Sequence, residues 1–145
     1  QKGCILMIDV DDFKSINDTY GHPTGDAMLV LIGSIIRNSF RTGDIIGRVG
    51  GDEFMVYAAD LVHIDTAREK AQKMLDQVAE RTWKETGCRA TISVGIAKSE
   101  GMETFEQLYS RADAMLYISK KSGKGRVAVG EDTAGFKPEK EPEDH

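Results

Sequence analysis

The chain has 145 residues, of which 40% are hydrophobic and 30% charged, and its formal net charge is −5. This composition is that of an ordinary globular domain, and the apolar runs are too short to predict a membrane span or a leader peptide. Residues 131–145 hold six acids and two lysines, so residues 1–130 are close to neutral. Near-neutrality argues against binding of a nucleic-acid polymer, which usually demands a basic face.

The composition divides the chain into one domain over residues 1–130 and an acidic tail over residues 131–145. The tail is proline-rich and poor in apolar residues, so we expect it to be disordered. Cys4 and Cys88 both lie in apolar stretches, which favours two buried thiols over a disulfide or a metal pair. These features predict a reduced, cytoplasmic domain, alone or as the output part of a larger, even membrane-anchored, protein.

In chain order we predict a strand, two helices, a hairpin, a helix, a strand, a helix and a closing strand, over residues 2–10, 11–21, 26–40, 44–59, 66–87, 88–97, 104–123 and 126–129. The first strand is a continuous apolar run, typical of a strand buried on both faces. Thr66 with Glu69, and Thr104 with Gln107, have the spacing of capping boxes and mark two helix starts. Because a hairpin interrupts the alternation of strands and helices, we expect a mixed sheet.

The hairpin between residues 44–49 and 54–59 has Gly50 and Gly51 at its tip, since glycine adopts a left-handed turn at little cost. Two adjacent acids, Asp52 and Glu53, follow these glycines. Like charges at such a tip repel each other, so their presence needs a reason.

Asp9 ends the first strand, and the hairpin would bring Asp52 and Glu53 beside it if the two lie next to each other. Carboxylates that close repel unless a proton or a cation lies between them. Their hard oxygen atoms suit Mg²⁺ or Mn²⁺, which bridge protein carboxylates and substrate phosphates. The turn from Val10 into the next helix would offer free backbone N–H groups to phosphate, and Lys14 adds a cation. The residues therefore predict a metal-dependent nucleotide site.

Other interpretations fit parts of this pattern. Asp11 and Asp12 could cap the helix that they precede, and for Asp12 alone we favour that interpretation. Asp52 and Glu53 could form a solvated turn. A phosphoacceptor receiver domain also places paired acids after its first strand, but it needs an aspartate after a later parallel strand, where this chain has a hairpin.

The sequence at residues 50–54, GGDEF, is the signature of the GGDEF family of bacterial diguanylate cyclases. Residues 7–29, 91–97 and 112–126 also resemble that family, and the resemblance extends over residues 4–129. It implies the palm-like fold of nucleotide polymerases and class III nucleotidyl cyclases, with a five-stranded mixed sheet flanked by helices. It also implies condensation of two GTP into cyclic di-GMP and two pyrophosphates.

The resemblance implies roles for single residues. Asp9, the carbonyl of Val10 and Asp52 would hold two Mg²⁺ or Mn²⁺ ions per active site. Asp52 would also be the base for the attacking hydroxyl, with Glu53 and Lys14 as further catalytic residues. The implied substrate contacts are Phe13, Asn17, His22, Asp26, Gly50, Gly51, Lys120 and Lys124.

Among these contacts, Asn17 and Asp26 would read the guanine edge. The carboxylate of Asp26 can accept hydrogen bonds from the N1–H and N2–H of guanine, whereas adenine offers no such pair of donors. Without the resemblance, Lys120 would be interpreted as a cation that favours the negative end of a helix. Lys124 replaces the family's usual arginine and loses a bidentate fork, while Gly125 replaces asparagine.

Arg41 and Asp44 match the family's RxxD product-inhibition site. A domain without catalysis could therefore still act as a cyclic di-GMP receptor. The resemblance further implies a transient homodimer for catalysis and an upstream sensory or receiver domain. Because the family pattern has a Leu-Thr-Gly-Leu loop and a helix before the first strand, where this chain begins, we expect a fragment of a longer protein.

Overall fold

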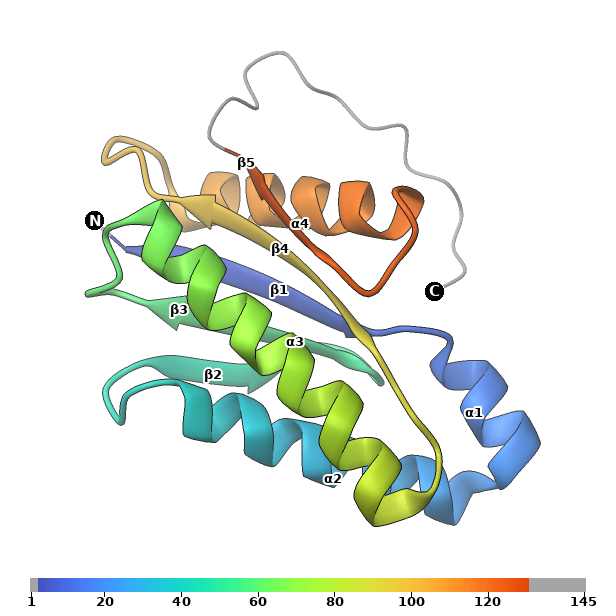
Figure 1. The fold of residues 1–145 in the computed structure, drawn as a ribbon. Coiled ribbons are helices and arrows are strands. Elements are labelled where there is room, and N and C mark those ends of the chain that lie inside the picture. The colour runs from blue at the N-terminus through green and yellow to red at the C-terminus, as the bar shows by residue number, and fades with distance from the viewer. Residues whose placement is uncertain (1–2, 131–145) are drawn as a thin grey trace.

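The computed structural model describes residues 3–130 and consists of one sheet with helices on both faces (Figure 1). Its elements are β1 Cys4–Val10, α1 Phe13–Tyr20, α2 His22–Ser39, β2 Ile45–Arg48, β3 Glu53–Ala58, α3 Ile64–Thr86, β4 Ile92–Lys98, α4 Phe105–Lys121 and β5 Val127–Gly130. The strand order is β2-β3-β1-β4-β5, with β5 parallel to β4 and all other neighbours antiparallel. The predicted mixed five-stranded sheet is confirmed. The acidic tail lies outside the described residues.

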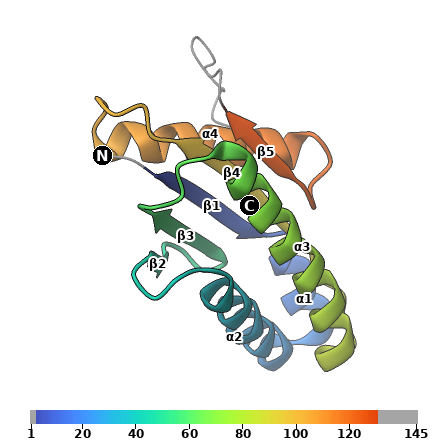
Figure 2. The same cartoon turned by 60° about the vertical axis from the view of Figure 1, so that its left-hand side comes forward.

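The central strand β1 is buried along its whole length because helices cover both of its faces. Leu6 and Ile8 belong to the larger core, which α2 and α3 close from one side. Ile5 and Met7 belong to a second core with residues of α4. Figures 1 and 2 show that α4 covers the face of the sheet opposite α2 and α3. Successive side chains of a strand alternate between faces, so Asp9 follows Ile5 and Met7 onto the α4 side.

Two helices begin earlier than the sequence predicts. α2 begins at His22, because Pro23 is well tolerated in the first turn of a helix. α3 begins at Ile64, whose side chain packs against the larger core. Thr66 therefore lies inside the first turn, and the predicted capping box with Glu69 is wrong.

The capping box at the start of α4 is confirmed. Thr104 accepts a hydrogen bond from the Gln107 N–H at 3.1 Å, and the Gln107 side chain accepts one from the Thr104 N–H at 2.8 Å. At the other end of α3, Gly87 ends the helix in a left-handed conformation with φ of 77°.

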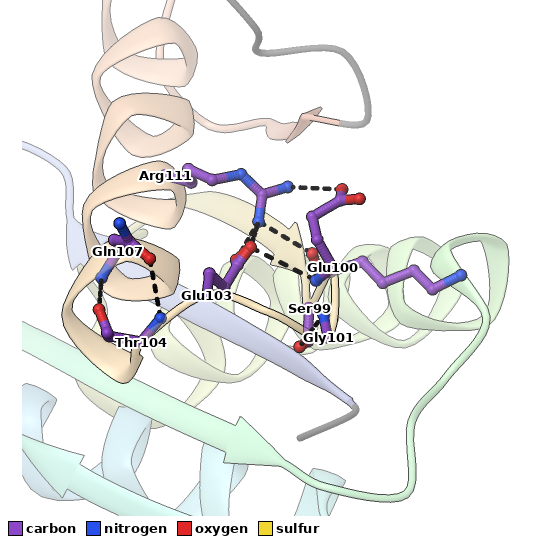
Figure 3. A network of polar contacts seen from close by, with 8 residues as sticks. Ser99, Glu100, Gly101, Glu103, Thr104, Gln107 and Arg111 are labelled. Carbon is purple, nitrogen blue, oxygen red and sulfur yellow. Dashed lines mark hydrogen bonds and ion pairs between the residues drawn. The ribbon is translucent and has the colours of Figure 1, made fainter.

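A polar network fixes the loop between β4 and α4 (Figure 3). The guanidinium of Arg111 donates to Glu103 at 2.6 Å, to the carbonyl of Lys98 at 3.0 Å and to Glu100 at 3.3 Å. Lys98 pairs with Cys4 across the sheet, so this network lies at the opposite end of β1 from Asp9.

Cys4 and Cys88 are buried free thiols, as predicted. Burial raises the pKa of the Cys4 thiol to about 11, so this thiol stays protonated. Across residues 3–130, none of the helices combines the length and apolar character that crossing a bilayer needs.

Candidate active site

The pairing of β1 with β3 brings the predicted acids together. Asp9 lies opposite Glu53 in the antiparallel register, and the N–H of Val10 donates to the carbonyl of Asp52 at 3.1 Å. Asp9 is fully buried, whereas Asp52 and Glu53 are partly exposed at the end of the hairpin. The expected convergence of the three acids at the carboxyl end of β1 is therefore present.

The burial of Asp9 sets the electrostatics of this site. The pKa of Asp9 is raised from 3.8 to about 7, chiefly by removal from solvent, and the nearby charges of Asp52 and Glu53 contribute to the rise. Lys120 opposes this shift, because its ammonium lies 2.6 Å from Oδ2 of Asp9. The last turn of α4 thus supplies a cation to the carboxylate of the central strand.

The hairpin tip is held by Arg48, which the sequence did not single out. Its guanidinium donates to the carbonyl of Gly50 at 3.3 Å and to that of Gly51 at 3.0 and 2.7 Å. Neither glycine has a positive φ, so the predicted left-handed turn is wrong. Four residues connect β2 and β3, and this longer loop can turn without left-handed residues.

The junction between β1 and α1 differs from the prediction at two acids. The N–H of Asp11 donates to the carbonyl of Thr91 at 2.9 Å and is not free for phosphate. Asp12 occupies the N-cap position of α1, but its side chain makes no capping bond. Its carboxylate instead pairs with Lys124 at 2.7 Å, so the capping interpretation of Asp12 is wrong.

The first turn of α1 still offers N–H groups, since a helix start leaves them without intrahelical carbonyls. Lys14 is exposed in this turn. On the next turn, Oδ1 of Asn17 is buried and has no hydrogen-bond partner among the described residues. A side chain at Gly25 would overlap this oxygen and crowd the ring of Phe13, so the glycine makes room for Asn17. His22 and Asp26 are exposed on the first turns of α2.

The RxxD residues lie apart from these acids. Ile45, directly after Asp44, pairs with Tyr57, which places the segment at the opposite end of the hairpin from Gly50. The N–H of Arg41 donates to Oδ2 of Asp44 at 2.9 Å, and the exposed guanidinium of Arg41 lies 3.3 Å from Asp60.

Within residues 3–130, no three acidic, histidine or cysteine side chains lie close enough together to hold a metal by themselves. A cation at Asp9 would therefore need ligands from the backbone or from a bound substrate as well. Magnesium sites at substrate phosphates commonly combine one or two carboxylates in this way.

The fold and the acids at the hairpin define a class of α+β domain with a candidate phosphate and cation site. Residues 1–126 match the family model described as "Diguanylate cyclase, GGDEF domain". The chain belongs to the GGDEF family.

Two curated relatives come from Escherichia coli strain K12. "Diguanylate cyclase DgcM" is 38% identical over 123 residues, which cover 85% of this chain and 30% of that protein. "Probable diguanylate cyclase DgcT" is 36% identical over 135 residues, covering 87% and 29%. The chain thus spans less than a third of the length of these relatives.

A solved structure has the same fold. The crystal structure of the GGDEF domain of DgcB from Caulobacter crescentus, in complex with c-di-GMP, superposes with a TM-score of 0.81. The two chains are 29% identical, and the match covers 90% of this chain and 79% of that one.

Proposed function

We propose that this domain is a diguanylate cyclase, which condenses two GTP into cyclic di-GMP and releases two pyrophosphates. The observation that carries the proposal is the register that sets Asp9 opposite Glu53, beside Asp52 and within 2.6 Å of Lys120. Acids and a lysine at one strand end suit a substrate that is rich in phosphate and is bound with cations. Relatives named diguanylate cyclases support the same reaction.

Asp9, Asp52 and the carbonyl of Val10 would hold two Mg²⁺ or Mn²⁺ ions. The donor set fits, since all three groups are hard oxygen ligands and the repulsion from Asp52 and Glu53 at Asp9 favours an added cation. When bound, the ions would neutralise phosphate charge and activate the attacking hydroxyl.

The protein's own residues would position the nucleotide. Asp52 would accept the proton of the 3′-hydroxyl, and Lys14 would stabilise charge on the phosphate. Glu53 would be a further catalytic residue beside Asp52. Lys120 and Lys124 would bind the triphosphate from the end of α4 and the loop after it. Gly50 and Gly51 carry no side chains, so the hairpin backbone could approach the nucleotide closely.

The guanine would lie between α1 and α2. Asn17 has a buried Oδ1 without a partner among the described residues, and a base donor would satisfy it. Asp26 would accept from the N1–H and N2–H of guanine, with His22 and Phe13 as neighbouring contacts. This donor pattern selects GTP over ATP.

One site supplies half of the product, so two domains would meet face to face in a transient homodimer. An upstream sensory or receiver domain would bring the two copies together, in keeping with the greater length of the curated relatives.

We place this activity in the reducing cytoplasm, where buried free thiols such as Cys4 and Cys88 persist.

A second candidate function is that of a cyclic di-GMP receptor. The exposed guanidinium of Arg41, beside the carboxylate of Asp44, could take a guanine by stacking and hydrogen bonds. In the related DgcB structure, c-di-GMP is bound to the domain.

Incubation with GTP and Mg²⁺, followed by identification of the product, tests the proposed reaction. The domain is best fused to a dimerising segment, so that encounter does not limit the rate. We expect cyclic di-GMP from the wild type and at least about 100-fold less from Asp52→Ala. An Asp52→Ala variant with wild-type turnover would overturn the assignment. Absence of product together with tight cyclic di-GMP binding would favour the receptor.

A further inference from the structure

Asp11 joins three parts of the chain that are far apart in sequence. Its carboxylate accepts hydrogen bonds from the hydroxyl of Thr91 at 2.6 Å, from the hydroxyl of Ser93 at 2.6 Å and from the N–H of Gly125 at 2.9 Å. The side chain is buried, with the residue 4% exposed. The end of β1, the start of β4 and the loop between α4 and β5 therefore meet at one carboxylate.

The loop that Asp11 holds has an unusual backbone. Gly123, Lys124 and Gly125 have φ values of 127°, 64° and 57°, so three consecutive residues are left-handed. A lysine adopts this conformation only at a steric cost, and the surrounding structure must hold it there. The N–H of Lys124 donates to the carbonyl of Ser119 at 3.0 Å, and the bond from Gly125 to Asp11 anchors the loop from the other side.

The anchored loop directs Lys124 toward the candidate active site. Its ammonium lies 2.7 Å from Oδ1 of Asp12, at the junction of β1 and α1. The same loop follows directly after the last turn of α4, which carries Lys120 to Asp9. The position of Lys124 relative to Asp12 thus depends on how this loop is held.

Neither capping nor metal binding explains Asp11. Asp12, not Asp11, occupies the N-cap position of α1. Both oxygens of the Asp11 carboxylate already accept hydrogen bonds from groups of the protein, and the side chain is shielded from solvent. A buried carboxylate with three donors is an internal anchor.

We propose that Asp11 is a positioning residue, which holds the loop over residues 122–126 so that Lys124 faces the junction of β1 and α1 and the phosphates of the substrate. This inference rests on the proposed function, because Lys124 is taken to bind the triphosphate. Asp11 itself does not touch the substrate. It acts through the backbone of Gly125.

The test compares Asp11→Ala with the conservative variant Asp11→Asn. An asparagine can still accept from Gly125 and Thr91 with its carbonyl oxygen and donate to the hydroxyl of Ser93, because hydroxyls both donate and accept. In nucleotide-free protein, we expect Asp11→Ala to accelerate hydrogen exchange of the Gly125 amide about 10-fold or more, and Asp11→Asn to restore most of the protection. Wild-type exchange in Asp11→Ala would overturn the proposal.

Kinetics with GTP and Mg²⁺ add a second readout. We expect Asp11→Ala to raise the KM for GTP about 10-fold, with less effect on kcat, and the addition of Lys124→Ala to raise it little further. Fully additive effects would show that Asp11 does not act through this loop. A wild type that neither binds GTP nor turns it over would refute the proposed function, while the exchange measurement would still decide the role of Asp11.

Two more variants keep the test decisive if Asp11→Ala does not fold. Thr91→Val removes one donor, and we expect it to raise Gly125 exchange by about threefold. Thr104→Val removes the capping hydroxyl at the opposite end of the sheet. It should lower the melting temperature but leave Gly125 exchange and the KM for GTP unchanged. Equal exchange at Gly125 in Thr91→Val and the wild type would overturn the proposal.

Discussion

The ammonium of Lys120 lies 2.6 Å from Oδ2 of Asp9 and joins the last turn of α4 to the end of the central strand. The two side chains are 16% and 0% exposed, so the pair is shielded from solvent. A cation that binds this carboxylate would meet Lys120 there. The ion pair therefore links the charge of the candidate active site to the position of α4.

We expect the stability of the metal-free protein to depend on the protonation of Asp9. Burial raises the pKa of Asp9 to about 7, above the value of 3.8 for an unperturbed group. The folded state binds this proton more tightly than the unfolded state does. Protonation of Asp9 therefore stabilises the fold fully below the unfolded pKa, and this contribution is lost as the pH rises through about 7. The free energy of unfolding should fall by about 1–3 kcal/mol from about pH 5 to about pH 8.

Urea denaturation of the wild type and of Asp9→Asn across this range measures the contribution, since other groups titrate equally in both proteins. Because Asp9→Asn lacks this titration, the difference in the free energy of unfolding between the two proteins should change by about 1–3 kcal/mol across this range. Parallel profiles for the two proteins would contradict the prediction.

Arg48 should be needed to hold the hairpin tip. Arg48→Ala removes the bonds to the carbonyls of Gly50 and Gly51, and we expect kcat/KM for GTP to fall about 10- to 100-fold because Asp52 loses its fixed position. Arg81→Ala is a matched control, since Arg81 also donates two bonds but to Glu85 on α3. Equal kinetics for the two variants would mean that the tip holds its shape without the guanidinium.

The base preference should follow Asn17 and Asp26. In a competition assay with equal GTP and ATP, we expect a pure cyclic di-GMP product from the wild type. Asp26→Ala should lose GTP affinity by about 10-fold or more, because the N1–H and N2–H of guanine lose their acceptor. Substantial ATP incorporation by the wild type would contradict this assignment.

Binding of cyclic di-GMP should depend on Arg41. Arg41→Ala removes an exposed guanidinium that pairs with the equally exposed Asp60 at 3.3 Å, so we expect the variant to fold. We expect calorimetry to show a loss of binding free energy on the order of 1.5–3 kcal/mol. Equal affinities of wild type and variant would mean that residues 41–44 form only a surface turn.

Arg111 should stabilise the fold without affecting the site. Arg111→Ala leaves Glu103, whose side chain is 11% exposed, without its cation, and we expect a cost of about 1–3 kcal/mol in the free energy of unfolding. The exposed Arg81–Glu85 pair should cost less than about 1 kcal/mol when Arg81 is removed. Denaturation curves and the KM for GTP check both effects, and a changed KM in Arg111→Ala would contradict the separation.

Several elements can be predicted from local chemistry along the chain. The continuous apolar run at residues 4–10 predicts a doubly buried strand, and Thr104 with Gln107 predicts the start of α4, because burial pattern and capping act over a few residues. The GGDEF stretch at residues 50–54 predicts both a hairpin and a family. The start of α3 differs from the predicted one, because packing of Ile64 against the core extends the helix beyond Thr66.

Contacts between distant parts of the fold set which side chains of the candidate site meet. Asp11 and Asp12 have the same local signals, yet one is a buried anchor and the other an exposed partner of Lys124. The partners of Asp11 at Thr91 and Gly125 lie 80 and 114 residues away in sequence. Strand register and the packing of α4 bring such groups together, and both result from contacts across the whole domain, which no local pattern contains.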